Sequence, residues 1–374
     1  MAATQTIEVP HLGGIKAGYA ISGGNNRIDP TKPTCVLINA MCMTVSLYRD
    51  QFDNAQLADA VNLLAIEPLG HGATSCPTEH FTYWDTAIMA LQVMEALGVG
   101  RAYALGTSQG AWMVARMALL APEKIQGLIL LGTSMDYESS ESRSKGCWDP
   151  AAMLSPFFEK WSSPTAATAT TNADDFVIDD VWCGMVGSVG FGEHGTPEKT
   201  AFWTRTLQEV YRGDEGRKKA KMALLNLITR DGLLHRLRDI KCQVHWLQGT
   251  KDVPYGTTIP TEHIKLFTSA PKAELTFIPD GGHYLNATNP VEVADAILKM
   301  VVTPYSIASF LVLQLLLLPP LPPRDTTVTS LDGAYTASAS ALVFGTLVQR
   351  RCMSRSCVKT SPNEGLFRRE RGVS

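Results

Sequence analysis

Short apolar runs alternate with stretches of helical periodicity along the first third of the chain. The runs predict buried β-strands, each ending at a turn signal, at residues 35–39, 61–67, 102–106 and 127–132. Between them, apolar residues recur every three or four positions at 83–99 and 109–122, which predicts two helices. A chain in which strands and helices alternate forms a parallel sheet that is covered by helices on both faces.

The pattern changes after this region and then returns. From about residue 135 to 238 the strand signal fades, and the sequence becomes helical and polar by turns. Strands are predicted again at 242–249 and 273–279, followed by an amphipathic closing helix at 290–301. A helical insertion between strands is the place for a cap, so we expect a cap at about 135–238 within a domain that spans 1–302.

Residues 303–374 differ in character from the rest. Residues 307–318 are an almost unbroken apolar run, but this run is shorter than the roughly 20 residues that a membrane-spanning helix needs. Residues 324–374 then carry eight Arg or Lys against four Asp or Glu. Two interpretations stay open: a tail that is disordered or attaches to a membrane surface, or a wrongly assigned gene end.

The composition, net charge and cysteine spacing exclude some classes of function. The 374 residues are 45% hydrophobic and 18% charged with a net charge of −3, the balance of a globular protein with no nucleic-acid partner. The eight cysteines occur singly, without the spacing of metal ligands, so we expect no metal site. The first residues lack the basic and apolar segments of a secretion signal. We therefore expect an intracellular, cytoplasmic protein.

The motif that carries chemistry is Gly106-Thr107-Ser108-Gln109-Gly110, which lies between a predicted strand and a predicted helix. This context is what a nucleophile elbow requires. A serine on such a sharp turn has strained dihedral angles, so the flanking Gly106 and Gly110 let the backbone and helix pass closely. We therefore predict that Ser108 is a nucleophile.

A serine hydroxyl needs a base that accepts its proton, and the base needs a carboxylate that orients it. His283 lies in a glycine-containing loop after the last predicted strand, which makes it the candidate base. Asp252 follows the strand before it, and the order Ser, Asp, His is the one expected of such a site. Asp136, just after an earlier strand, is the rival acid.

The oxyanion of the reaction needs two N–H donors. We predict the backbone N–H of Gln109 as one and that of Met41, in the loop after strand 35–39, as the other. Asn39 is placed to hold that loop by hydrogen bonds. His71, between two glycines in a loop after strand 61–67, is interpreted as a structural loop histidine.

These motifs resemble the α/β-hydrolase superfamily, through GTSQG, EPLGHGATS, GTKDVP and GGHY over roughly residues 15–302. The resemblance implies an α/β fold with a mostly parallel eight-stranded sheet flanked by helices, and a helical cap after strand six. It implies no metal and no organic cofactor. LINAMCMT and EPLGHGATSCPTEHFTYWD further resemble fungal hydrolases of secondary-metabolite and host-selective toxin biosynthesis. Some of those carry a C-terminal peroxisomal tripeptide, and this chain ends Gly-Val-Ser instead.

Three hypotheses follow for the activity. The first is a serine esterase or thioesterase acting on a small-molecule acyl substrate. The second is an acyltransferase that uses the same three residues. The third is a non-catalytic fold kept for a ligand pocket, which an intact Ser, His and Asp set disfavours. A serine rather than an aspartate at the elbow argues against dehalogenase and epoxide hydrolase chemistry. The oligomeric state is not readable from the sequence.

Overall fold

The computed structural model describes residues 3–23, 26–162 and 175–302. The predicted tail at 303–374, with its apolar run, lies outside the described residues. Within them, no helix combines the length and apolar character that crossing a membrane requires.

An eight-stranded sheet forms the centre of the molecule, in the order β1-β2-β4-β3-β5-β6-β7-β8. The strands are β1 (Gln5–Val9), β2 (Ile15–Ile21), β3 (Thr34–Ile38), β4 (Asn62–Ile66), β5 (Ala102–Thr107), β6 (Ile125–Leu131), β7 (Gln243–Gly249) and β8 (Ala273–Ile278). Only β2 runs against its neighbours, since it pairs antiparallel with both β1 and β4 while all later pairs are parallel. The predicted mostly parallel, eight-stranded sheet is confirmed.

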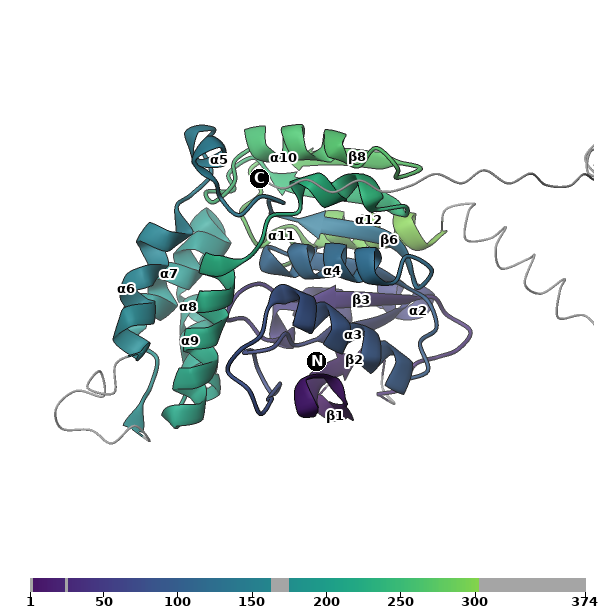
Figure 1. Ribbon diagram of the computed structural model, residues 1–374. Helices are drawn as coiled ribbons and strands as arrows, with labels where there is room; N and C mark the ends of the chain where they lie inside the picture. The colour runs from purple at the N-terminus through teal and green to yellow at the C-terminus, as the bar shows by residue number, and fades with distance from the viewer. Residues whose placement is uncertain (1–2, 24–25, 163–174, 303–374) are drawn as a thin grey trace, which may run out of the picture. The chain divides into compact units, whose positions relative to one another are not determined.

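Helices cover both faces of this sheet because successive side chains of a strand point to opposite sides. On β3, Val36 and Ile38 pack toward α3 (Tyr83–Ala96) and α4 (Gln109–Leu120), which lie together on the face turned to the viewer in Figure 1. Cys35 and Leu37 pack on the other face, against α1 (Arg49–Phe52), α2 (Ala55–Ala60), α11 (Leu285–Thr288) and α12 (Pro290–Val302). The continuous apolar runs of the inner strands follow from burial on both sides.

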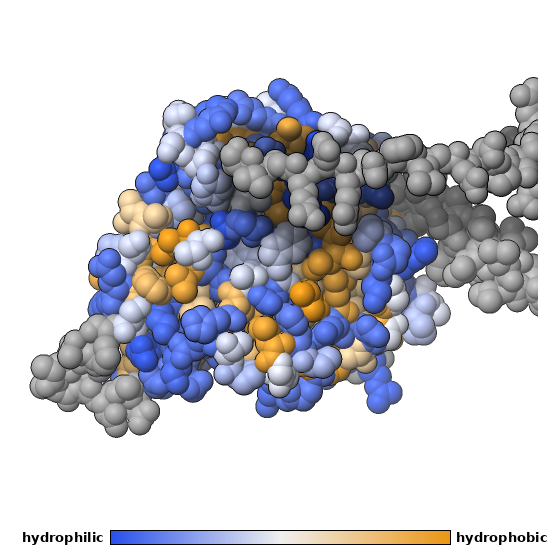
Figure 2. Space-filling model, in the orientation of Figure 1, coloured by the Kyte–Doolittle hydropathy of each residue, from blue (hydrophilic) through white to orange (hydrophobic). Residues whose placement is uncertain are grey.

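Between β6 and β7 the chain leaves the sheet and forms helices, which Figure 1 shows standing beside the sheet, in the range for which the sequence predicts a cap. We call them the cap helices: α5 (Ser140–Ser144), α6 (Pro150–Ser162), α7 (Asp180–Phe191), α8 (Pro197–Val210) and α9 (Gly213–Thr229). They share an apolar cluster with the loop after β3, in which Trp161 and Trp182 are fully buried. Figure 2 shows apolar side chains also reaching the surface over these helices, where Met153, Val177 and Val181 are exposed. After β7 follows the short helix α10 (Thr258–His263).

Most predicted elements lie within a few residues of the observed ones, but β1 and β2 have no counterpart in the prediction. These strands are short, and β2 is buried along nearly its whole length, with Lys16 as its one exposed residue. Their pairing with each other and with β4 is antiparallel. β1 alternates between more and less exposed residues, but over only five positions, and β2 does not alternate. The alternation of strands with helices that marks the later sheet is also missing here.

Candidate active site

Ser108 sits on a strained turn between β5 and α4. Its dihedral angles are φ 55° and ψ −122°, which few residues other than glycine adopt. A Cβ on Gly106 would lie 2.2 Å from the carbonyl carbon of Gly110, and one on Gly110 would lie 2.0 Å from the carbonyl oxygen of Ile38. Both glycines are therefore required by close backbone approach, the reason that the sequence analysis assigned to them.

Hydrogen bonds to the neighbouring strand hold the turn in this conformation. The Ser108 N–H donates to the carbonyl of Leu131 at 2.8 Å, and the Thr133 hydroxyl donates to the carbonyl of Ser108 at 3.1 Å. Strain of this kind persists only where the surrounding structure imposes it, and it is typical of functional sites.

His283 and Asp252 meet at the ends of β8 and β7. His283 Nδ1 lies 2.9 Å from Asp252 Oδ2, and both side chains are buried. The other oxygen of Asp252 accepts the backbone N–H of Tyr255 at 3.0 Å, which fixes the carboxylate. A carboxylate beside Nδ1 keeps the proton on that nitrogen, so the lone pair of Nε2 is left to accept one.

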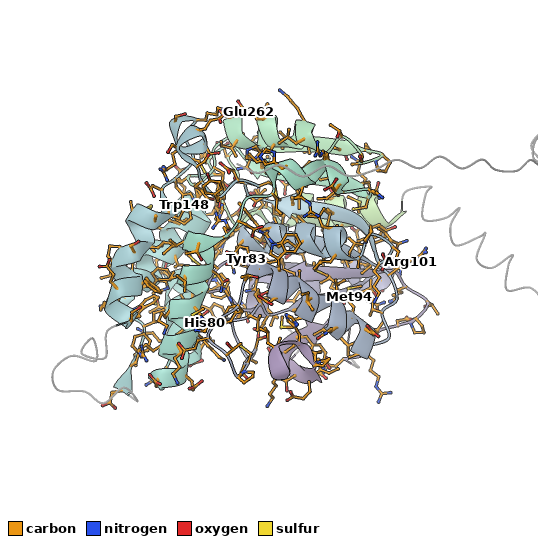
Figure 3. All side chains as sticks on the ribbon, in the orientation of Figure 1. His80, Tyr83, Met94, Arg101, Trp148 and Glu262 are labelled. Carbon is orange, nitrogen blue, oxygen red and sulfur yellow. The ribbon has the colours of Figure 1, made fainter. Side chains whose placement is uncertain are left out.

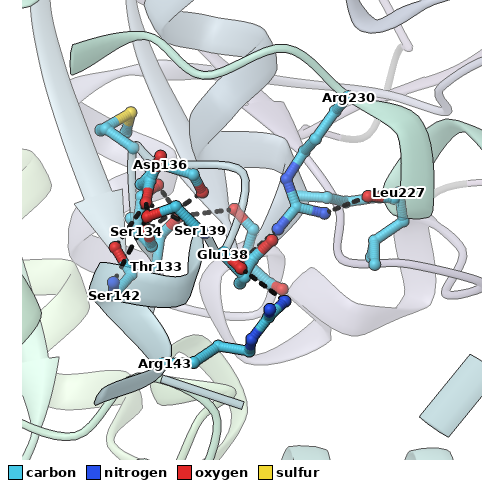
Figure 4. A network of polar contacts seen from close by, with 12 residues as sticks. Thr133, Ser134, Asp136, Glu138, Ser139, Ser142, Arg143, Leu227 and Arg230 are labelled. Atoms are coloured by element: carbon cyan, nitrogen blue, oxygen red, sulfur yellow. Dashed lines mark hydrogen bonds and ion pairs between the residues drawn. The ribbon is translucent and has the colours of Figure 1, made fainter. Parts of the chain in front are cut away.

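Asp136 lies in another network. Its Oδ2 accepts hydrogen bonds from the hydroxyls of Ser139 and Ser142 and from the Ser139 N–H (Figure 4). Burial by itself would raise the pKa of Asp136, but these hydrogen bonds bring it below its ordinary value. The rival carboxylate thus organises the turn into α5, while Asp252 faces the histidine.

The loop after β3 takes a backbone conformation that the sequence did not reveal. The Asn39 side chain donates to the carbonyls of Met43 and Ala40, so it holds the loop in the way expected of it. Cys42 has a φ of 61°, which turns the chain sharply directly after Met41. Glu67, buried at the end of β4, accepts the N–H groups of Val45 and Ala73 and joins this loop to the one after β4.

A small cavity brings these parts together. The space in it that can hold the centre of a water molecule is about 20 Å³. Its walls come from Ser108, Met41, His283 and Tyr284 on the sheet side and from Trp148, Met185, Val186, Val189 and Leu227 on the cap side. Figure 3 shows Trp148 at the side of the molecule where the cap helices stand.

Gly132 is a site residue that the sequence analysis missed. It follows β6 with a φ of 50°, and a Cβ there would lie 2.9 Å from Asp252 Oδ2 and 2.4 Å from the carbonyl oxygen of His283. Any side chain would therefore displace the Asp252–His283 pair. A lone glycine at the end of a predicted strand was the only sequence signal.

His71, interpreted from the sequence as a structural loop histidine, is buried with a partner at each ring nitrogen. One partner was not expected: its Nε2 lies 2.8 Å from the side-chain nitrogen of Gln109, directly after Ser108. The contact joins a loop and a helix that lie 38 residues apart, so no local pattern could have indicated it.

Comparison with known proteins identifies the fold. Residues 33–170 match the family profile of the α/β hydrolase fold. The chain is similar to a probable hydrolytic enzyme from Pseudomonas aeruginosa PAO1, with a TM-score of 0.62 and 17% identity over 81% of this chain and 95% of that one. At this identity the likeness shows the fold alone, and the chain has the α/β-hydrolase fold.

Two relatives of this chain have different named activities. A 2-heptyl-3-hydroxy-4-quinolone dioxygenase from Rhodococcus erythropolis is 24% identical over 51% of this chain and 72% of its own length. A probable 1-acylglycerol-3-phosphate O-acyltransferase from Oryza sativa subsp. japonica is 24% identical over 70% of this chain. The chain spans 65% of the length of that second relative. One fold thus carries different chemistry in the two, and the activity has to be argued from the site.

Proposed function

We propose that this α/β-hydrolase-fold protein is a serine hydrolase that cleaves an ester or thioester through Ser108, His283 and Asp252. The observation that carries the proposal is the buried His283–Asp252 hydrogen bond of 2.9 Å beside a serine in the elbow conformation, with Ser108 and His283 on the wall of one cavity. The close backbone contacts at Gly106 and Gly110, which leave no room for a Cβ on either side of this serine, also support the proposal.

The proposed reaction begins with proton transfer from Ser108 Oγ to His283 Nε2 as the oxygen attacks the acyl carbon. Asp252 stabilises the imidazolium that forms. The backbone N–H groups of Gln109 and Met41 donate to the oxyanion, and the position of Gln109 at the first turn of α4 adds the helix dipole to that field.

The tetrahedral intermediate then collapses. His283 gives its proton to the leaving alcohol or thiol, which leaves an acyl group on Ser108. Water, deprotonated by the same histidine, attacks this acyl-enzyme and releases the acid.

The cap side of the cavity indicates the kind of acyl group. Five of the nine lining residues are apolar or aromatic side chains of the cap segment, so we propose an uncharged, apolar acyl chain as substrate. A charged acyl group would lose its hydration there without gaining a partner.

The test is labelling with a fluorophosphonate probe followed by intact-mass spectrometry, on wild type and on Ser108→Ala. We expect one adduct on wild type and none on the variant, together with a loss of at least about 1,000-fold in esterase kcat. No adduct and no turnover by well-folded wild type would favour the ligand-binding hypothesis instead.

Acyl transfer is the second candidate, and the rice relative named as a probable acyltransferase favours it. In that case an alcohol or thiol of a second substrate takes the place of water in the last step. Product analysis with and without an acceptor separates the two, because hydrolysis that no acceptor diverts would count against transfer.

The biological role that we propose is a step in fungal secondary-metabolite biosynthesis, of the host-selective toxin type, in the cytoplasm or the peroxisome. It rests on the resemblance of the LINAMCMT and EPLGHGATSCPTEHFTYWD segments. Deleting the gene should make one acylated metabolite accumulate and remove the product of its hydrolysis, and an unchanged metabolite profile would reject the role. A fluorescent fusion reports the compartment.

A further inference from the structure

A line of buried hydrogen bonds runs behind the elbow, from helix α3 through helix α4 to the loop after β4. The Tyr83 hydroxyl donates to Gln109 Oε1 at 3.0 Å. Gln109 Nε2 lies 2.8 Å from His71 Nε2, and His71 Nδ1 lies 2.9 Å from the carbonyl oxygen of Leu69. Tyr83, Gln109 and His71 are each at most 3% exposed.

The direction of every hydrogen bond in this line is determined. A carbonyl can only accept, so His71 Nδ1 must carry the proton and His71 Nε2 must be an acceptor. The donor that His71 Nε2 accepts from must be the side-chain NH₂ group of Gln109. Gln109 Oε1 then faces the Tyr83 hydroxyl and accepts its proton in a hydrogen bond. Each group has one partner of the right polarity, so the Gln109 side chain has one orientation.

Both ends of the line stay uncharged near neutral pH. Burial lowers the pKa of His71 to about 4, and the charge of Lys219 acts in the same direction. Burial raises the pKa of Tyr83 to about 12, with Glu138 raising it and Arg230 and Arg116 lowering it. A histidine that remains neutral is suited to holding a neighbour in place and not to moving protons.

The residue held in this way is the one directly after Ser108. We propose that Tyr83 and His71 are positioning residues that, through the Gln109 side chain, hold the Gln109 backbone N–H at the reacting carbonyl. This inference rests on the proposed function. Helix α3 and the loop after β4 thus both hold the side-chain amide of Gln109. A preorganised backbone donor contributes to catalysis because it needs no rearrangement as the oxyanion forms.

Two variants of Gln109 test the contact itself in the ligand-free protein. In Gln109→Glu a carboxylate faces the lone pair of His71 Nε2, so we expect His71 to bind a proton and its pKa to rise by more than two units, near neutral pH or above. The probe is NMR titration of the histidine imidazole signals, assigned with His71→Asn. In Gln109→Met the pKa stays low. An unshifted His71 in Gln109→Glu overturns the proposal.

Kinetics with p-nitrophenyl acetate test the positioning. We expect Tyr83→Phe and Gln109→Met to lower kcat about tenfold with KM within twofold, less than the loss of 100-fold or more for a missing oxyanion donor. The matched control is Tyr19→Phe, which removes one hydroxyl bonded to Gln5 in strand β1, and its kcat should equal that of wild type. Circular dichroism confirms that each variant is folded.

The outcomes separate the two proposals. A folded Tyr83→Phe and Gln109→Met with wild-type kcat overturn the positioning role, even if Ser108 reacts with the fluorophosphonate probe. If wild type neither reacts with the probe nor turns over, the proposed function fails and the positioning role fails with it. The His71 titration still reports in that case whether the hydrogen bonds exist.

Discussion

The two walls of the cavity differ in how they are built. The sheet-side wall consists of loops at the strand ends. Hydrogen bonds hold these loops in strained backbone conformations, with a positive φ at Cys42, Ser108 and Asp280. The cap-side wall consists of apolar side chains from helices, such as Val186 and Leu227, held by packing. A rigid wall suits the placement of reacting groups to within a fraction of an ångström, and a packed apolar wall suits the selection of a substrate.

Polar contacts join the cap segment to the sheet side at several places. Among them, the Tyr211 hydroxyl donates to the carbonyl of Gly70 at 3.2 Å, and Lys219 Nζ donates to the carbonyl of Gly72 at 3.0 Å. The N–H of Tyr284, next to His283, donates to the carbonyl of Gly190 in α7 at 2.9 Å. Glu138, before α5, and Arg230, after α9, form a buried ion pair that links the two ends of the cap segment (Figure 4). If chemistry and selection are separated in this way, substitutions on the two sides should have effects of different kinds.

The largest effect is expected on the sheet side, from a matched pair of aspartates. Asp252→Asn should lower kcat about 10,000-fold, because an amide no longer fixes the tautomer of His283. Asp136→Asn should leave kcat within a few-fold of wild type. It should lower the free energy of unfolding by about 1 kcal/mol, through weakened hydrogen bonds from Ser139 and Ser142.

Stability against pH checks the assignment of Asp136 further. Because its pKa in the folded protein is lowered, its contribution to stability is present above pH about 4 and is lost as the pH falls through the lowered pKa. The difference in unfolding free energy between wild type and Asp136→Asn should therefore shrink on acidification. A loss of kcat in Asp136→Asn as large as in Asp252→Asn would show that Asp136 is needed for the reaction, against that assignment.

The next effect is expected where the two ends of the cap segment meet. Glu138→Gln leaves Arg230, which is 2% exposed at its side chain, buried beside a neutral partner. We expect the free energy of unfolding to fall by about 3 kcal/mol, measured by urea denaturation. The matched control is Glu141→Gln, which removes a largely exposed pair with Lys145 and should not change stability measurably. Equal stability of both variants would show that the buried Glu138–Arg230 ion pair contributes nothing.

The smallest effect is expected on the cap side. Val186 lines the cavity, whereas Val181 on the same helix is 72% exposed. Val186→Ala should shift the preference among p-nitrophenyl esters toward longer acyl chains, about fivefold in the ratio of kcat/KM values for octanoate and acetate. Val181→Ala should leave that ratio unchanged. A fall in kcat for every ester in Val186→Ala would instead show that the cap wall takes part in positioning the reacting groups.

The sequence by itself determined strands β3–β8 and the elbow, because both depend on local rules. Apolar runs on doubly buried strands, helical spacing on α3, α4 and α12, and glycines on either side of Ser108 are all visible within short windows. The order of Ser108, Asp252 and His283 along the chain is also visible in the sequence, and it is the order expected of such a site.

Only the tertiary structure decided what meets across the sheet. The contact of His283 with Asp252 and not Asp136, the closeness of Gly132 to that pair, and the contact of His71 with Gln109 each join residues from separate elements. Such contacts depend on the strand order and on how the loops pack above it. The conformation of any one turn or helix depends on steric constraints within a few residues. A contact between loops that are far apart in the sequence depends on how the whole domain packs.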